Sequence, residues 1–134
     1  MSAENVEVVR RAADAFNRGD VDALMADAVD DFLFLPGRSA LHGGYRGEAG
    51  LRKFFADNEE TYEVFTMRID EIREVGDQVV QIGIVHLRAR GGGLDTEGPL
   101  AAVVTLRAGK MVKVEDFRER SAALAAVGLS DVRG

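Results

Sequence analysis

The chain has 134 residues, a length typical of one domain built around one hydrophobic core. Its net charge of −6 and its pI near 4.9 argue against a nucleic-acid-binding surface, and it contains no cysteine for a disulfide or a reactive thiolate. The sequence has no apolar run long enough to cross a bilayer and no apparent signal peptide, so we expect a cytoplasmic protein with no nucleic-acid or membrane partner.

The first third of the chain is predicted to be mainly helical. Apolar side chains recur at helical spacing over residues 2–18, and a second helix is expected over residues 21–28. A short apolar strand over 31–35 leads into a glycine-rich loop over 38–44. After a brief strand at 45–46, a third helix turns four large side chains to its inner face: Leu51, Phe54, Phe55 and Tyr62.

The pattern then changes from helical spacing to alternation. The predicted elements are strands over 64–75, 78–90, 96–107 and 110–120, and a short helix over 121–127. Residues 129–134 are expected to be a frayed tail of a single domain spanning 1–134. Helices followed by long antiparallel strands, with no βαβ rhythm, indicate the α+β class. A curved sheet would wrap around the helices, and four aromatic rings would line the concave space: Phe16, Phe34, Phe54 and Phe55.

Asp116 is the first candidate for chemistry. Alternation puts Val112, Val114 and Asp116 on one face of the last strand. A carboxylate that continues an apolar row is expected to lose water and resist ionisation, as general acids and bases that work near neutral pH do. An Asp paired with an Arg, or one at a solvated strand end, has the same pattern, so both interpretations stay open.

Other polar residues could join Asp116 at one end of the cavity. In the strand over 78–90 the drier face carries Ile82, Ile84, His86 and Arg88, and we expect this face to be concave. His86, Arg88 and Arg118 would then converge with Asp116, where His86 could shuttle a proton and an Arg could stabilise an enolate. Alternatively, His86 is a satisfied interior residue and the two arginines reach the rim to form ion pairs.

Two further expectations concern binding. Tyr45 could donate a hydrogen bond at the mouth of the pocket, or simply pack against the third helix. The two histidines lie far apart in the sequence, without a close-spaced set of ligands, so we expect no metal and no cofactor.

The last hairpin has two apolar faces. A two-residue turn at 108–109 predicts that Ala101 and Val103 share the face of Asp116, while Leu100, Ala102 and Val104 lie on the other. One face can cover the helices, but the other needs a second cover. We therefore expect a homodimer that forms through the outer face of the sheet.

Four segments resemble the SnoaL-like branch of the nuclear transport factor 2-like superfamily. They are residues 15–20 (AFNRGD), residues 45–51 (YRGEAGL), residues 109–116 (GKMVKVED) and residues 123–129 (ALAAVGL). The resemblance covers nearly the whole chain. It implies a cone-shaped fold, in which a curved sheet and three helices enclose a pocket, commonly as a dimer.

The resemblance also implies a range of functions. The family includes polyketide cyclases, ketosteroid isomerases, limonene epoxide hydrolases and pocket proteins without an assigned activity, so the fold does not settle the function. In SnoaL-type cyclases an Asp of the final strand is the acid/base, and the position that matches it is Asp116. Limonene epoxide hydrolases carry Arg-x-Asp on the fourth strand, where this chain has His86-x-Arg88.

Three hypotheses remain open after the sequence alone. The first is an isomerase or cyclase that uses Asp116 on a mostly apolar carbonyl compound. The second is a non-catalytic ligand-binding or dimerisation module. The third is a hydrolase in which Asp116 and His86 activate water, as in an epoxide hydrolase.

Overall fold

The computed structural model describes residues 2–37 and 43–130. Over these residues the chain forms four helices and six strands. In chain order they are α1 (Ser2–Arg18), α2 (Val21–Ala26), β1 (Ala28–Leu35), β2 (Tyr45–Arg46), α3 (Gly47–Thr61), β3 (Tyr62–Val75), β4 (Gln78–Ala89), β5 (Asp95–Arg107), β6 (Lys110–Asp116) and α4 (Arg120–Ala126). Most of the loop expected over 38–44 lies outside the described residues. None of the helices within them is long and apolar enough to cross a membrane.

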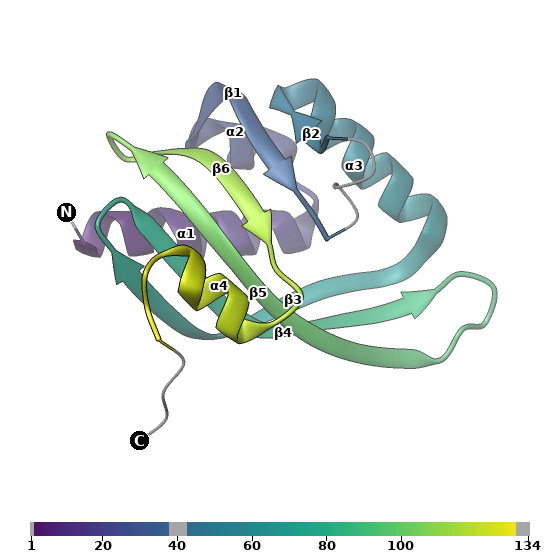
Figure 1. Ribbon diagram of the computed structural model, residues 1–134. Helices are drawn as coiled ribbons and strands as arrows, with labels where there is room; N and C mark the ends of the chain where they lie inside the picture. Colours follow the sequence, from purple (N-terminus) through teal and green to yellow (C-terminus); the bar gives the residue numbers. More distant parts are fainter. Residues whose placement is uncertain (1, 38–42, 131–134) are drawn as a thin grey trace.

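The six strands form one curved sheet in the order β2-β1-β6-β5-β4-β3. Neighbouring strands are antiparallel except β1 and β6, which are parallel. Figure 1 shows α1, α2 and α3 on the concave side of this sheet and α4, in yellow, on the opposite side. The fold is therefore α+β and cone-shaped, as the sequence predicted, and its larger core lies between the three helices and the concave face.

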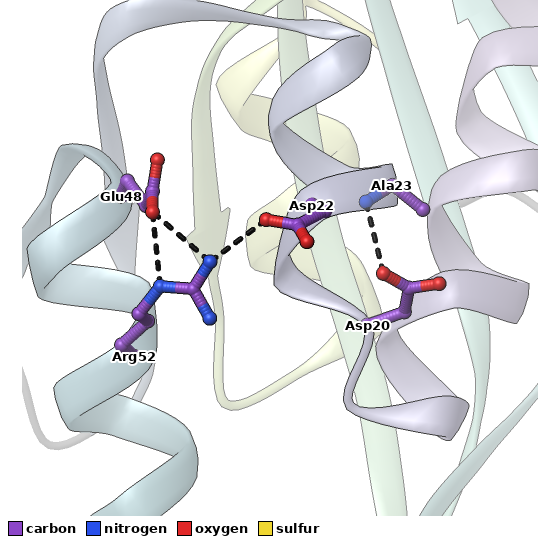
Figure 2. Close-up of polar contacts among 5 residues, drawn as sticks. All are labelled: Asp20, Asp22, Ala23, Glu48 and Arg52. Carbon is purple, nitrogen blue, oxygen red and sulfur yellow. Dashed lines mark hydrogen bonds and ion pairs between the residues drawn. The ribbon is translucent and has the colours of Figure 1, made fainter.

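Polar contacts cap the start of α2 and link α2 to α3 (Figure 2). The carboxylate of Asp20 accepts a hydrogen bond of 3.0 Å from the backbone N–H of Ala23, which caps the first turn of α2. Arg52 of α3 donates to Glu48 one turn earlier, at 3.0 Å, and to Asp22 of α2, at 2.7 Å. These contacts link α2 to α3 at the surface, where exposed ion pairs add only modest stability.

Asn17 ties the end of α1 to β3, the outermost strand at that edge of the sheet. Its amide accepts from the backbone N–H of Met67 at 2.9 Å and donates to the backbone C=O of the same residue at 2.8 Å. The side chain thus makes with the backbone of Met67 the two hydrogen bonds that a further strand would make at this edge. The Asn in the AFNRGD segment therefore has a structural task, which is to hold the helix against the sheet.

Gly83 lies where β3 and β4 approach each other most closely. A Cβ atom at this position would lie 1.8 Å from the carbonyl oxygen of Arg68 on β3, so the position has no room for a side chain. Gly83 pairs with Ile69, next to an irregularity in β3 between Ile69 and Glu71. Glycine and this irregularity together let β3 bend over β4.

The hairpin between β5 and β6 corrects the predicted register. Its two-residue turn is present, with positive φ at Ala108 and Gly109, and Arg107 pairs with Lys110. However, the pairing shifts by one residue between Thr105 and Leu106, so that Val112 is an extra residue. Ala102, and not Ala101, therefore lies opposite Asp116. The prediction that Ala101 and Val103 share its face was wrong, because no sequence signal marked this bulge.

The outer face of the sheet has a smaller core of its own. The helix α4 covers a cluster of fully or largely buried side chains that comprises Val80, Ala101, Val103, Ala123, Leu124 and Val127. Arg120 of α4 donates to Glu71 of β3 at 2.5 Å and so holds the helix on the sheet. Leu129, expected in the frayed tail, packs against this cluster, whereas residues 131–134 lie outside the described part of the chain.

Candidate functional site

A cavity of about 530 Å³ lies between the concave face of the sheet and the three helices. Its volume is in the range of small-molecule sites. Apolar side chains from α1, α3 and the strands provide most of the lining, among them Val9, Phe16, Phe34, Phe54, Val85 and Leu100. Polar groups enter this wall at only a few places, which include Asp116 on β6, Gln81 on β4 and Asp57 on α3.

Aromatic rings make one wall of the cavity and also belong to the core. Phe34 and Phe54 meet edge to face with ring centroids 4.8 Å apart, and Phe16 contacts both. These three rings line the cavity, as their positions in the sequence suggested. Phe55 differs from that expectation: its ring packs 5.2 Å from the ring of Phe16 but does not line the cavity.

Tyr45 packs against the third helix, which is one of the two interpretations that the sequence left open. It lines the cavity, and its ring packs edge to face against Phe54 with the centroids 5.4 Å apart. Its hydroxyl lies 3.4 Å from a carboxylate oxygen of Asp57 on α3. Asn58, Thr61 and Tyr62 line the cavity beside them, so this wall is the more polar one.

Among the described residues, Asp116 is the ionisable group whose pKa is shifted most. It ends β6, follows Val114 on the concave face and borders the cavity, so it keeps part of its surface accessible. Burial among apolar atoms raises its pKa from the usual 3.8 to about 7, and the neighbouring Glu115 carboxylate adds to the rise. A backbone hydrogen bond from Gly37 acts in the opposite direction.

Asp116 therefore has the protonation behaviour of a general acid or base. No Lys or Arg of the described residues forms an ion pair with it, unlike most other carboxylates in β3 to β6. With a pKa near 7, both its neutral and its ionised forms are well populated at neutral pH. The sequence predicted this environment from the apolar row that leads to Asp116.

His86 and Arg88 do not join Asp116. Gln81 and Val85 of β4 line the cavity, whereas Val80, on the alternate face, belongs to the outer core under α4. Because β4 and β5 pair without irregularity, His86 and Arg88 share the outer face with Val80. The prediction that this face is concave was wrong: α4 covers part of the outer face, which makes that face as apolar as the inner one.

On the outer face, both residues have acidic neighbours. Nε2 of His86 lies 3.5 Å from Oδ1 of Asp95, and the guanidinium of Arg88 lies 2.6 Å from the same oxygen. The pairing with Arg88 lowers the pKa of the Asp95 carboxyl. Arg88 also lies 3.5 Å from the carboxylate of Glu63. The two residues form a surface polar cluster with Asp95, and neither of them lines the cavity.

Arg118 also differs from its expected place. It follows the end of β6, is exposed to solvent and does not line the cavity. The sequence predicted a strand as far as residue 120, and alternation along that strand would have brought Arg118 beside Asp116. Since β6 ends at Asp116 and the chain then turns towards α4, this alternation does not apply.

The sequence interpretation missed Gln81. Its side chain is only 6% exposed, it lines the cavity, and its Oε1 atom has no hydrogen-bond partner among the described residues. A single amide inside the apolar run VVQIGIV was the available signal. This signal was weak beside His86 and Arg88, two ionisable side chains that lie on the other face of the same strand.

A search against family models finds that the SnoaL-like domain matches residues 9–114. An uncharacterized protein of Mycobacterium tuberculosis is 29% identical over 115 residues, which cover 84% of this chain and 87% of that protein. A nuclear transport factor 2-like protein of unknown function from Burkholderia pseudomallei superposes with a TM-score of 0.76 at 20% identity, over 93% of this chain and 98% of the other.

A candidate polyketide cyclase of Xanthomonas campestris pv. campestris superposes with a TM-score of 0.72 at 22% identity. The match covers 94% of this chain and 98% of that protein. At this level of identity the two solved structures establish a common fold and leave the chemistry of the present cavity to its own residues.

Proposed function

From the premise that this chain belongs to the SnoaL-like domain family, we propose that it is a cofactor-independent enzyme acting on a small, mostly apolar carbonyl compound. The reaction would be an isomerisation or a cyclisation that begins with proton transfer next to the carbonyl. Asp116 would be the catalytic acid/base, and the aromatic wall would hold the ring system of the substrate.

The observation that carries this proposal is the environment of Asp116. It combines a cavity of about 530 Å³, a predominantly apolar wall and one carboxyl whose pKa is raised to about 7. Structural carboxylates are usually paired or solvated, as those of the outer face are. A carboxyl kept in an apolar cavity without an ion-pair partner costs stability, which favours a role in function over a role in folding.

The proposed steps require only Asp116. In its ionised form the carboxylate removes a proton from the carbon next to the carbonyl, and the electron pair of the broken C–H bond moves into an enolate. If the substrate has a C=C bond next to that carbon, the anion is a dienolate, and the carboxyl returns the proton to its far carbon, which shifts the double bond and completes an isomerisation. If the substrate has a second carbonyl, the enolate carbon attacks it, and the carboxyl gives its proton to the resulting alkoxide, which closes a ring. Apolar surroundings keep water away from the enolate.

The exchange of ketone α-protons for deuterium tests this proposal without knowledge of the natural substrate. A bicyclic apolar ketone such as 2-decalone is incubated in D₂O with the protein, and the loss of its α-proton signals is followed by NMR. We expect exchange in the wild-type protein to be faster than in Asp116→Asn by about 10²-fold or more. The rate should rise with pH through about 7, as the base form of Asp116 appears.

Asp95→Asn is the matched control, because it makes the same change to a carboxylate on the outer face. It should exchange the ketone at the wild-type rate. Equal exchange rates for wild type and Asp116→Asn, with a ketone that demonstrably binds, would remove the catalytic role. Failure of such ketones to bind at all would contradict the proposed substrate class.

A non-catalytic ligand-binding module is the second candidate. One observation favours it: the His and Arg side chains expected to assist Asp116 lie on the outer face. The same geometry removes support for a hydrolase in which His86 and Asp116 share a water. Tight ketone binding without Asp116-dependent exchange would be the result expected of a binding module.

We also propose that two copies associate through the outer face of the sheet. Next to the area that α4 covers, this face carries Ile82, which packs against the cluster under α4, and Ile84. Both are only half-buried and lie near the polar cluster of His86, Arg88 and Asp95. An apolar patch with a charged rim is typical of an interface between subunits. Sedimentation equilibrium should give a dimer for the wild type and a monomer for Ile84→Asp; a monomeric wild type at micromolar concentration would refute the proposal.

A further inference from the structure

Gln81 is a buried amide on the same concave face of the sheet as Asp116, two strands away from it. Its side chain is 6% exposed and belongs to the cavity lining, and its Oε1 atom lacks a hydrogen-bond partner among the described residues. A buried amide without a partner costs about 1–3 kcal/mol. If the amide were placed the other way round, its NH₂ group would take the position without a partner in place of the oxygen. One end of the amide is therefore unsatisfied in either orientation.

The sheet places Gln81 and Asp116 in one row across three strands. Gln81 pairs with Ala102 on β5, and Ala102 pairs with Asp116 on β6. Since neighbouring strands lie about 4.8 Å apart, the Cα atoms of Gln81 and Asp116 are about 10 Å apart on the same concave face. Ala102, which is 2% exposed, is the small residue between them and leaves an open apolar floor.

We propose that Gln81 is a second polar anchor of the cavity and that the ligand carries two oxygens, one at Asp116 and one at Gln81. This inference rests on the proposed function, in which Asp116 meets a carbonyl. The second oxygen is a hydroxyl or a further carbonyl on the far side of a ring system, because the floor between the two anchors is apolar and about two strands wide. Compounds with a carbonyl alone leave the amide unpaired and bind less tightly.

A matched pair of probes tests this inference. The compound 2,6-dihydroxynaphthalene carries hydroxyls at the two ends of a flat ring system, and 2-naphthol carries only one. Isothermal titration calorimetry should show that the wild-type protein binds the diol about five- to ten-fold more tightly than the naphthol. In Gln81→Met, which keeps the length of the side chain and removes the amide, this preference should disappear.

The design remains valid whichever anchor the single hydroxyl of naphthol prefers. In the wild type the diol can use both anchors and naphthol only one, whereas in Gln81→Met each compound can use only Asp116. Gln78→Met is the matched control: Gln78 lies on the same strand but faces outward, where its amide contacts the hydroxyl of Thr105 at 3.3 Å. It should keep the wild-type preference for the diol.

The possible results separate this inference from the proposed function. If both compounds bind and the preference is absent in the wild type or unchanged in Gln81→Met, Gln81 is no anchor, and the acid/base proposal for Asp116 stands. If neither compound binds, the apolar ligand class is wrong and both proposals fail. Without ligand, Gln81→Met should melt at or above the wild-type temperature, because it removes an unsatisfied amide. If Gln81→Met does not fold, Gln81→Leu takes its place in the experiment. If both variants are destabilised and the preference for the diol is unchanged, Gln81 has a structural role.

Discussion

The two faces of the sheet use the same residue types in opposite ways. Asp116, on the concave face, borders an apolar cavity, has no basic partner among the described residues and has a pKa raised to about 7. Asp95, on the outer face, has an ion pair with Arg88 and a lowered pKa. Both are strand aspartates; the fold places Asp116 where its charge is costly and Asp95 where its charge is stabilised.

This contrast helps to separate functional from structural polar residues. On the outer face several carboxylates have an opposite charge beside them, as Glu71 has Arg120 and Arg73. On the concave face Oε1 of Gln81 has no hydrogen-bond partner among the described residues, and Asp116 has a backbone hydrogen bond from Gly37 but no ion pair with a described Lys or Arg. Unpaired polar groups that border a cavity are the ones for which a ligand can provide the partner.

The largest difference should appear when one large side chain is removed from the core that α3 forms against the concave face and one from the outer face. Phe54 is 6% exposed and contacts four other phenylalanine rings. Phe54→Ala should reduce the free energy of unfolding by about 3–5 kcal/mol, measured by urea denaturation, because it leaves a hole in the core. Ile84→Ala, at a half-buried site on the outer face, should cost less than half of that; equal losses would refute the contrast in packing.

The pH dependence of stability should distinguish the two aspartates. Between pH 4 and about 7 folded Asp116 keeps a proton that the unfolded chain has released, so the free energy of unfolding should fall as the pH rises through this range and then level off. Asp116→Asn cannot titrate, so its stability relative to the wild type should increase over the same range. The increase is at most about 4 kcal/mol, since one pKa unit corresponds to about 1.4 kcal/mol.

Asp95→Asn should behave in the opposite way. The folded pKa of Asp95 is lowered, so its contribution to stability is present at neutral pH and is lost as the pH falls through the folded pKa. Its substitution should therefore destabilise the protein at neutral pH and have no effect at strongly acidic pH. Urea denaturation of the three proteins across this pH range is the measurement, and parallel curves for wild type and Asp116→Asn would mean that Asp116 is an ordinary surface carboxyl.

The smallest effect is expected at His86. The sequence pattern suggested that His86 acts with Asp116, whereas the geometry places it beside Asp95 on the outer face. His86→Ala should therefore leave the rate of ketone α-proton exchange within about two-fold of the wild type. A loss comparable to that of Asp116→Asn would show that the outer face takes part in the chemistry after all.

Much of the fold could be predicted from the sequence because each element carries a local pattern. Helical spacing over residues 2–18 and alternation over residues 64–75 follow directly from the side-chain periods of helix and strand. The face of Asp116 could also be predicted. Val114 and Asp116 are two residues apart at the end of the strand, so they share a face even though the bulge at Val112 precedes them. The burial of that face by the helices is what turned a pattern into a raised pKa.

The faces of β4 and the register of β5 could not be predicted in the same way. Both faces of β4 are apolar, because the short helix α4 covers part of the outer one, and hydrophobicity therefore could not tell the cavity side from the other. The bulge at Val112 is a property of the paired strands and has no glycine or proline to mark it. The first error placed His86 and Arg88 on the wrong face of the sheet, and the second moved the partner of Asp116 by one residue, which in a strand also means to the opposite face.

Gly83 has a consequence for how this cavity can diversify. The backbone of β3 occupies the space that any side chain at position 83 would need, so the curvature of the sheet depends on a residue that has no tolerated alternative. Libraries made to alter ligand preference should therefore keep position 83 constant and vary positions that contribute side chains to the cavity wall, such as Gln81, Val85 and Leu100. In this protein the curvature of the sheet and the ligand preference of the cavity are therefore controlled by different positions.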